Sequence, residues 1–216
     1  MSEKGFSSII LDVDSTLCGI EGIDWLALRS GGDGAARVAG LTERAMRGEI
    51  ALESVYAERL ALVNPTWDAI AALANAYAGA LAPGAANAVR TLSAAGRRVV
   101  LVSGGIREAI LPLALQLGIP QRDVHAVSVR FDELGAYAGF DTGSPLATAA
   151  GKRAVAESAA LPRRILAMGD GVTDLAMRPV VDAFAAFTGF VNRPQVVELG
   201  DVVLDSFDQL VELVLS

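Results

Sequence analysis

Short runs of aliphatic residues recur along the chain, each dense enough to form a strand that is buried on both faces. These runs are Ser8–Val13, Arg98–Ser103, Ile165–Gly169, Ala183–Phe187 and Val202–Leu204. Apolar residues recur at helical spacing in the stretches Gly84–Ala95, Arg107–Leu117, Thr148–Ala160 and Phe207–Leu215. Continuous apolar strands that alternate with helices predict an α/β fold, a doubly wound parallel sheet covered by helices on both faces.

The alternation is interrupted twice. Residues 17–80 show helical patterning and no convincing strand, with helices expected at Ile23–Arg29, Ala35–Arg47, Leu52–Leu62 and Trp67–Ala80. We expect this segment, the helical insertion, to form a small cap domain on a core made of residues 1–16 and 81–216, with Trp25 and Trp67 in its own small core. In the second interruption, Val127–Phe140, the turn Glu133-Leu134-Gly135 predicts a β-hairpin.

Composition narrows the class of protein. The 216 residues are 52% hydrophobic, which is enough for a packed core. Eighteen Lys and Arg stand against 25 Asp and Glu, and the net charge of −7 argues against nucleic acid as a partner. One cysteine, Cys18, fits a reducing compartment, and neither a secretory segment nor a membrane-spanning run of apolar residues is recognisable. We therefore expect a cytoplasmic protein without a membrane partner, either a monomer or a homodimer.

Paired carboxylates follow two of the predicted strands. Asp12 and Asp14 end the first strand, and Asp170 and Asp174 follow Ile165–Gly169. Because the carboxyl ends of parallel strands meet at one edge of the sheet, we expect the four acids to converge there, where their repulsion requires a cation. Oxygen ligands without a neighbouring histidine indicate Mg²⁺ and not zinc. The alternative is that these aspartates only cap turns.

Two weaker signals lie at other strand ends. Ser103 and Gly104 precede a predicted helix, where a hydroxyl and free N–H groups can bind an anion, although Ser-Gly-Gly is also an ordinary turn. Lys152 begins a later helix, either as a solvated surface lysine or as the ammonium that balances a phosphoryl group. His125 is the only histidine, so a Ser-His-Asp triad is excluded, and we expect it in a loop or at a strand start.

Taken in order, these motifs resemble those of the haloacid dehalogenase (HAD) superfamily of phosphotransfer hydrolases, and in particular its phosphoserine phosphatase family. The matching segments are Asp12-Val13-Asp14-Ser15-Thr16, Glu21-Gly22-Ile23-Asp24, Arg44-Ala45-Met46, Glu58-Arg59-Leu60-Ala61-Leu62, Val102-Ser103-Gly104-Gly105, Tyr137-Ala138-Gly139-Phe140 and Gly169-Asp170-Gly171-Val172-Thr173-Asp174. Each segment alone is common, whereas their shared order along nearly the whole chain is specific.

The resemblance implies roles for the four acids. Asp12 would be the nucleophile that forms an aspartyl-phosphate, and Asp14 the acid that protonates the leaving alkoxide and then accepts a proton from water. The Asp12 carboxylate, the Asp14 main-chain oxygen and Asp170 would hold Mg²⁺, with Asp174 in support.

The resemblance also implies which groups bind the phosphoryl oxygens. These would be Ser103, the Gly104 N–H and Lys152, which together supply alignment and charge compensation. Arg193 matches a family arginine near the mouth of the site.

Family positions in the helical insertion imply the rest of the substrate. Glu21 matches the residue that receives a substrate ammonium, Arg59 the arginine that binds its carboxylate, and Met46 an apolar wall beside it. The alternative is that Glu21 and Arg59 are ordinary surface charges paired with Asp24 or Glu58.

The implied function is that of a phosphoric monoester hydrolase, the Mg²⁺-dependent hydrolysis of O-phospho-L-serine to L-serine and phosphate that closes serine biosynthesis. Leu52 departs from the family because an aromatic residue commonly lines the pocket there. Another small phosphomonoester as substrate, or phosphoryl transfer to an acceptor alcohol, is therefore left open. A silent binding module is a further alternative, against which the retained acids argue.

Overall fold

The computed structural model describes residues 5–31, 33–46, 50 and 52–216. Within these ranges, the side chains of residues 42, 43, 45, 46 and 52–54 lie outside the description. Among the described residues, no helix has the length and apolar character needed to cross a membrane.

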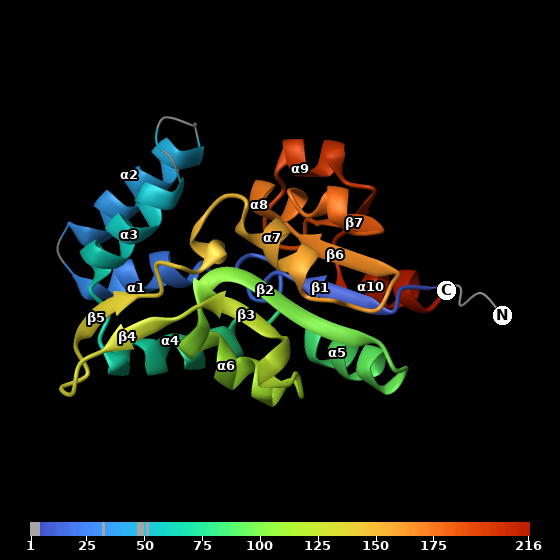
Figure 1. Ribbon diagram of the computed structural model, residues 1–216, viewed down its shortest axis with the longest axis horizontal. Helices are drawn as coiled ribbons and strands as arrows, with labels where there is room; N and C mark the ends of the chain where they lie inside the picture. Colours follow the sequence, from blue (N-terminus) through green and yellow to red (C-terminus); the bar gives the residue numbers. More distant parts are fainter. Residues whose placement is uncertain (1–4, 32, 47–49, 51) are drawn as a thin grey trace.

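A six-stranded parallel sheet forms the centre of the molecule, in the order β3-β2-β1-β6-β7-β8 (Figure 1). The strands are β1 Ser8–Leu11, β2 Arg98–Ile106, β3 Val124–Val127, β6 Ile165–Gly169, β7 Ala183–Phe187 and β8 Val202–Leu204. β1 and β6 are adjacent and parallel, with Leu11 opposite Met168, so the residues that follow them leave the sheet at one edge. The order of strands reverses between these two, which is where doubly wound sheets bind ligands.

The predicted parallel sheet is confirmed, with differences at its edge. β6, β7 and β8 have the predicted bounds, whereas β1 ends at Leu11 and β2 continues to Ile106. β3, which contains His125, was not predicted as a separate strand because its four residues run directly into the hairpin region. The buried faces of β1 and β6 explain their continuous apolar sequences.

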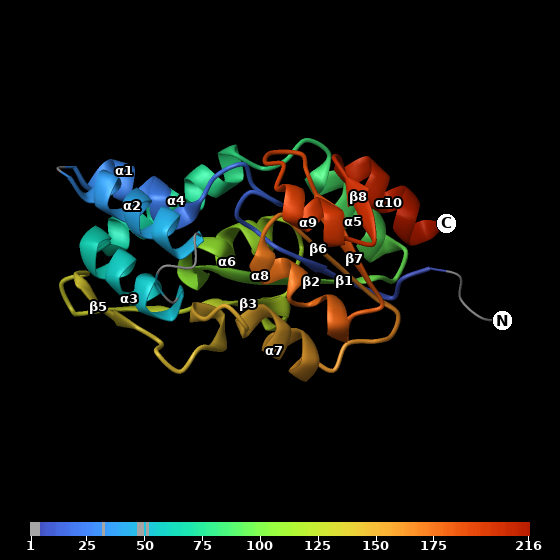
Figure 2. The ribbon, with the colours of Figure 1, turned by 90° about the horizontal axis from the view of Figure 1, so that it is seen from above.

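Helices cover both faces of the sheet (Figures 1 and 2). One face carries α5 (Ala85–Ala94), α6 (Arg107–Gln116) and α10 (Phe207–Leu215), and α10 packs against α5. The other carries α7 (Gly151–Ser158), α8 (Val172–Leu175) and α9 (Pro194–Leu199). The helix expected from Thr148 begins only at Gly151, because a 3₁₀ turn at Pro145–Ala147 precedes it.

The helical insertion forms the four helices that its sequence predicts. They are α1 Gly22–Ser30, α2 Gly34–Met46, α3 Leu52–Val63 and α4 Trp67–Gly79. The Thr66 hydroxyl caps α4 by accepting a hydrogen bond from the Ala69 N–H at 3.2 Å. α4 packs against α6, and this contact holds the insertion against the rest of the molecule (Figure 1).

The predicted hairpin is confirmed as β4 (Val129–Phe131) and β5 (Tyr137–Phe140), and it packs against the insertion. Trp67 meets Phe131 edge-on at a centroid distance of 5.4 Å. Trp67 begins α4, and despite this contact 54% of it is exposed, so its assignment to a small core of the insertion is wrong. Trp25 is partly buried and packs against the main core, as the insertion shares one hydrophobic cluster with the sheet.

The insertion leaves and re-enters the sheet region at one place. The Gly19 N–H donates to the Ala80 carbonyl at 2.8 Å, and the Ala82 N–H donates to the Leu17 carbonyl at 2.9 Å. Two connections that lie side by side are what an inserted unit requires. The division into two domains at residues 17 and 80 stays a prediction.

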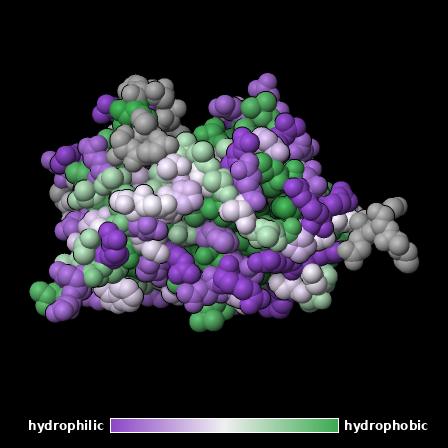
Figure 3. All heavy atoms as spheres, in the orientation of Figure 1, coloured by the Kyte–Doolittle hydropathy of each residue, from purple (hydrophilic) through white to green (hydrophobic). Residues whose placement is uncertain are grey.

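On the face shown in Figure 3, hydrophilic and hydrophobic residues are interspersed over the described part of the surface.

Candidate active site

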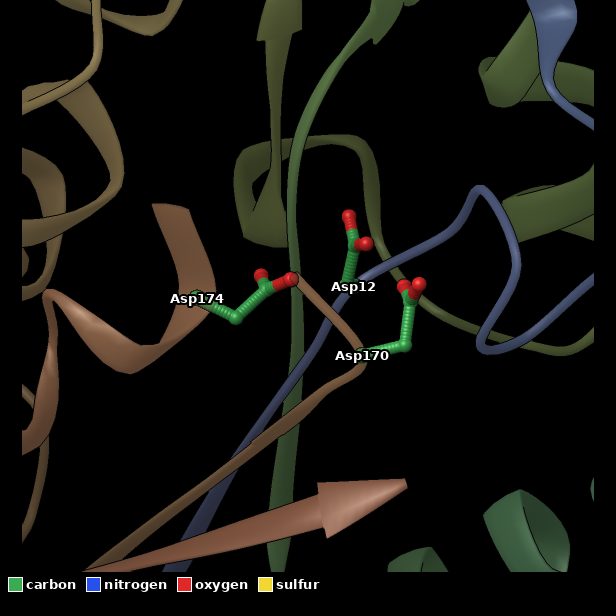
Figure 4. Close-up of side chains that lie close together, drawn as sticks. All are labelled: Asp12, Asp170 and Asp174. Atoms are coloured by element: carbon green, nitrogen blue, oxygen red, sulfur yellow. The ribbon is translucent and has the colours of Figure 1, made fainter. Parts of the chain in front are cut away.

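Three carboxylates meet at the carboxyl edge of the central strands (Figure 4). Asp12 follows β1, Asp170 follows β6 and Asp174 lies in α8. One oxygen from each lies within 4.8 Å of the others, and no member of the group is more than 4% exposed. The structure therefore brings together three of the four acids expected there.

Lys152 lies within this group of carboxylates. Its Nζ is 2.6 Å from Asp12 Oδ1 and 2.6 Å from Asp174 Oδ1, and only 6% of the residue is exposed. Burial lowers the pKa of Lys152, but the charges of Asp12 and Asp174 outweigh it and hold that pKa above its ordinary value. The interpretation of Lys152 as a solvated surface lysine is therefore wrong.

Gly151 allows this approach, because a Cβ there would collide with the carbonyl oxygen of Pro145 and push the first turn of α7 away.

Burial disfavours the ionised forms of the carboxylates in this group. Desolvation, followed by the negative charge of Asp174, raises the pKa of Asp12 well above its ordinary value. Desolvation and the charge of Asp174 also raise the pKa of Asp170 to about 6. Mg²⁺ prefers oxygen donors such as these buried, close-lying carboxylates. The positive charge of the ion would offset the repulsion between the carboxylates and favour their ionised forms. The residues present therefore fit a hard divalent cation.

Asp170 and Asp174 are also held by neighbouring donors. Arg193 Nε lies 2.9 Å from Asp170 Oδ2, and the Thr16 hydroxyl donates to Asp170 Oδ1 at 3.2 Å. The Gly171 N–H donates to Asp174 Oδ2 at 3.0 Å. Arg193, expected near the mouth of the site, thus contacts one of the three acids directly.

The Asp14 carboxylate is held by donors of the helical insertion. Its Oδ1 accepts a hydrogen bond from the Tyr77 hydroxyl at 2.6 Å and another from the Gly22 N–H at 3.2 Å. Asp14 thus stays outside the group of three close oxygens, because a buried donor from α4 holds its carboxylate, but it lines the same cavity as the other three acids and, in addition to burial, its charge raises the pKa of Asp12. Burial, and next the charge of Glu21, raise the pKa of Asp14 to about 7.

Two glycines make room for this arrangement. A Cβ on Gly22 would overlap the Tyr77 hydroxyl, and a Cβ on Gly105 would lie 3.2 Å from Asp14 Oδ2. Substitution at Gly22 would therefore displace the donor that holds Asp14.

Ser103 lies in β2, three residues before the strand ends at Ile106. It is buried, and its Oγ accepts a hydrogen bond from the Gly105 N–H at 2.9 Å. The register of β2 shifts between Val102 and Ile106, and α6 begins directly afterwards. Along this irregular part of β2, Ser103 and Gly104 line a cavity that Asp12 and Lys152 also line.

The cavity measures about 160 Å³ and lies between the acidic edge and the helical insertion. Among the described residues of the insertion, those that line the cavity are Glu21, Ile23, Tyr56 and Arg59. Glu21 is exposed, and one of its carboxylate oxygens accepts a hydrogen bond from the Ser15 hydroxyl at 2.6 Å. Acidic and basic side chains therefore face the cavity from the side opposite Lys152.

Arg59 fits both interpretations of its sequence position. Its Nη2 lies 2.9 Å from Asp24 Oδ2, so the expected surface pair exists. Its side chain is nevertheless only 13% exposed and lines the cavity. The side chains of Met46 and Leu52 lie outside the described residues, so the apolar wall expected at Met46 stays a prediction.

Sequence reasoning missed Tyr56 and Tyr77. Both are apolar enough to read as core positions of a helix, and Tyr77 lies 63 residues from the carboxylate it contacts. The only available signal was a hydroxyl at a buried helical position, since a buried phenol usually finds a partner.

Comparison with known proteins agrees with this geometry. Residues 9–192 match the family model of haloacid dehalogenase-like hydrolases. The chain is 36% identical over 206 residues to phosphoserine phosphatase of Rattus norvegicus, covering 94% of this chain and 91% of the relative. It is 33% identical over 213 residues to the chloroplastic phosphoserine phosphatase of Arabidopsis thaliana, covering 96% and 72%.

Solved structures share the fold. A phosphoserine phosphohydrolase-like protein from Francisella tularensis superposes with a TM-score of 0.85 at 26% identity, covering 96% of this chain and 99% of that one. A substrate-bound phosphoserine phosphatase complex superposes with a TM-score of 0.80 at 24% identity, over 97% and 99%. With its family match, its relatives and its buried acidic group, this chain belongs to the haloacid dehalogenase-like hydrolases, in the phosphoserine phosphatase family.

Proposed function

We propose that this protein hydrolyses O-phospho-L-serine to L-serine and phosphate, with Mg²⁺, through an aspartyl-phosphate on Asp12. The observation that carries the proposal is the two-sided cavity. A carboxylate–lysine group faces it from the sheet, while Glu21 and Arg59 face it from the insertion. The first side suits a phosphoryl group, and the second suits a zwitterionic head group with one ammonium and one carboxylate. The curated relatives above support the substrate.

Asp12 would be the nucleophile. One carboxylate oxygen of Asp12 attacks phosphorus and the bond from phosphorus to the seryl oxygen breaks, which leaves the phosphoryl group on Asp12. Lys152, already 2.6 Å from Asp12, would balance the charge of the transferred group together with Ser103 and the Gly104 N–H.

Asp14 would transfer the proton. Its raised pKa of about 7 lets it hold a proton near neutral pH and donate it to the departing seryl oxygen. The resulting carboxylate then takes a proton from the water that attacks the aspartyl-phosphate, which releases phosphate and restores both aspartates. Burial and the neighbouring Glu21 separate its pKa from that of an ordinary surface aspartate.

The metal would be held by Asp12 and Asp170, with the main-chain oxygen of Asp14. Bound Mg²⁺ supplies positive charge that aligns the phosphoryl group and stabilises its oxygens. Asp174 would act mainly through Lys152 and Gly171, both of which it already contacts.

Phosphate release tests the proposal. The purified protein should release phosphate from O-phospho-L-serine at a higher kcat/KM than from O-phosphothreonine or phosphoethanolamine, and a chelator should abolish release until Mg²⁺ is restored. Asp12→Asn should abolish it permanently, whereas Asp205→Asn, on the exposed surface, should leave it unchanged. Equal kcat/KM values on all three substrates would contradict a preference for phosphoserine and indicate a phosphatase that accepts a broader range of phosphomonoesters. Turnover by Asp12→Asn would rule out the aspartyl-phosphate.

A further inference from the structure

Two donors on α3 are buried at the cavity without a partner. The Tyr56 hydroxyl and Arg59 Nε have no hydrogen-bond partner among the residues that the structure describes, and both residues line the cavity. They are three residues apart on one helix, which places them on the same face. Buried polar groups are nearly always hydrogen-bonded, so two adjacent exceptions at a cavity point to an acceptor that a ligand supplies.

Neither side chain can easily turn away to satisfy itself. The Tyr56 ring packs edge-on against Phe140 of β5, with centroids 5.3 Å apart, and only 6% of the residue is exposed. Asp24 holds Nη2 of Arg59 at 2.9 Å and so orients the guanidinium while leaving Nε unpaired. The two donors are therefore presented by fixed groups.

The chemistry of the pair favours a carboxylate as the acceptor. Burial, followed by the negative charge of Asp14, raises the pKa of Tyr56 above its ordinary value, so the hydroxyl keeps its proton. Two neighbouring donors, one of them charged, match the two oxygens of a carboxylate. A substrate ammonium is instead served by Glu21, which comes from the loop before α1.

We propose that Tyr56 is a specificity-determining residue, whose hydroxyl donates a hydrogen bond to the substrate carboxylate that Arg59 binds. This inference rests on the proposed function and extends it to a residue that the family resemblance does not supply. Leu52 occupies the position where the family commonly has an aromatic residue, and Tyr56 follows four residues later, one helical turn along α3. Tyr56 would thus supply the pocket with an aromatic ring and, in addition, a hydroxyl donor from the next turn of α3.

Tyr56→Phe tests the hydroxyl alone, because the ring and its contact with Phe140 remain. Steady-state kinetics with O-phospho-L-serine and phosphoethanolamine, which differ by the carboxylate, provide the readout. We expect kcat/KM for phosphoserine to fall about 10- to 100-fold, the range for a hydrogen bond to a charged group, mainly through KM. We expect less than about a twofold change for phosphoethanolamine. Tyr137→Phe, on β5 and outside the cavity lining, is the matched control and should change neither value.

Thermal unfolding of the unliganded variant separates binding from folding. Because the hydroxyl lacks a partner in the described structure, Tyr56→Phe should melt at or above the wild-type temperature. A lower melting temperature, or equal losses on both substrates, would make the hydroxyl structural and overturn the inference. Unchanged kinetics on phosphoserine would also overturn it, while a wild-type preference for phosphoserine would preserve the proposed function. A wild-type protein without that preference would overturn both.

Discussion

The two sides of the cavity are prepared to different degrees. At the edge of the sheet, charged groups already form ion pairs: Lys152 bridges Asp12 and Asp174, and Arg193 holds Asp170. On the insertion side, the Tyr56 hydroxyl and Arg59 Nε have no partner in the described structure. The comparison teaches that the acidic edge is preorganised by the protein, whereas under the proposed function the side that selects the substrate is completed by the ligand.

The preorganised side should be the most sensitive to mutation. Lys152→Gln leaves Asp12 and Asp174 buried without their shared cation, and we expect activity to fall on the order of 10³-fold. Loss of one partner of a buried ion pair should also lower the free energy of unfolding by about 3–5 kcal/mol. Phosphate release and urea unfolding measure the two effects.

Arg153→Gln is the control for that variant, since Arg153 is the next residue of α7 and pairs with the exposed Glu157. If Lys152→Gln kept wild-type stability and rate, the acidic edge would not be preorganised by its lysine.

The selecting side should respond to mutation according to substrate. Arg59→Ala should lower kcat/KM for phosphoserine by about 10- to 100-fold and leave phosphoethanolamine nearly unaffected, because only the former carries a carboxylate. Asp24→Asn, which removes the charge that orients Arg59, should produce a smaller loss of the same kind. Equal losses on both substrates would assign Arg59 to the structure of the insertion and not to selection.

The acidic edge should also set how stability depends on pH. The pKa values of Asp14 and Asp170 are raised to about 7 and about 6 in the folded protein, above the unfolded value of 3.8. Between about pH 4 and 7 the native state therefore binds more protons than the unfolded state, and the free energy of unfolding should fall as pH rises through that window. Urea unfolding in the presence of a chelator measures this slope.

Asp14→Asn and Asp170→Asn should each flatten the slope, by at most about 1.4 kcal/mol per pH unit. Asp205→Asn, at an exposed site, should leave the slope as it is. A metal-free stability that rises over the same window would contradict the raised pKa values.

The smallest expected effect lies where the two sides meet. The Tyr77 hydrogen bond lowers the pKa of Asp14 against the larger effects of burial and Glu21, so Tyr77→Phe should raise that pKa further. We expect a roughly threefold to tenfold loss of kcat, in line with one hydrogen bond, and an alkaline limb of kcat/KM displaced to higher pH. A pH–rate profile measures both effects, with Tyr137→Phe as the control. If the alkaline limb of kcat/KM stayed at the same pH, Tyr77 would have no role in proton transfer.

The sequence predicted whatever depends on local pattern. The strands β6 to β8 were bounded correctly because continuous apolar runs are typical of buried parallel strands. The meeting of Asp12 with Asp170 and Asp174 followed from strand order, since β1 and β6 end at the same edge.

What the sequence could not supply are contacts between distant segments. The hydrogen bond from Tyr77 to Asp14 depends on how α4 is placed, and the contact of Trp67 with Phe131 depends on where the hairpin lies. Neither has a periodic signature, because each is decided by tertiary packing across 60 or more residues.

The paired hydrogen bonds that join Gly19 to Ala80 and Leu17 to Ala82 have an engineering consequence. Because the chain enters and leaves the insertion at adjacent points, another segment can replace it without a change in strand order. Under the proposed function, the substrate preference could then be redesigned while the residues that bind the phosphoryl group are kept. Beyond its own fold, a transplanted segment would need to restore the packing of α4 against α6 and a hydrogen-bond donor to Asp14 in the place of the Tyr77 hydroxyl.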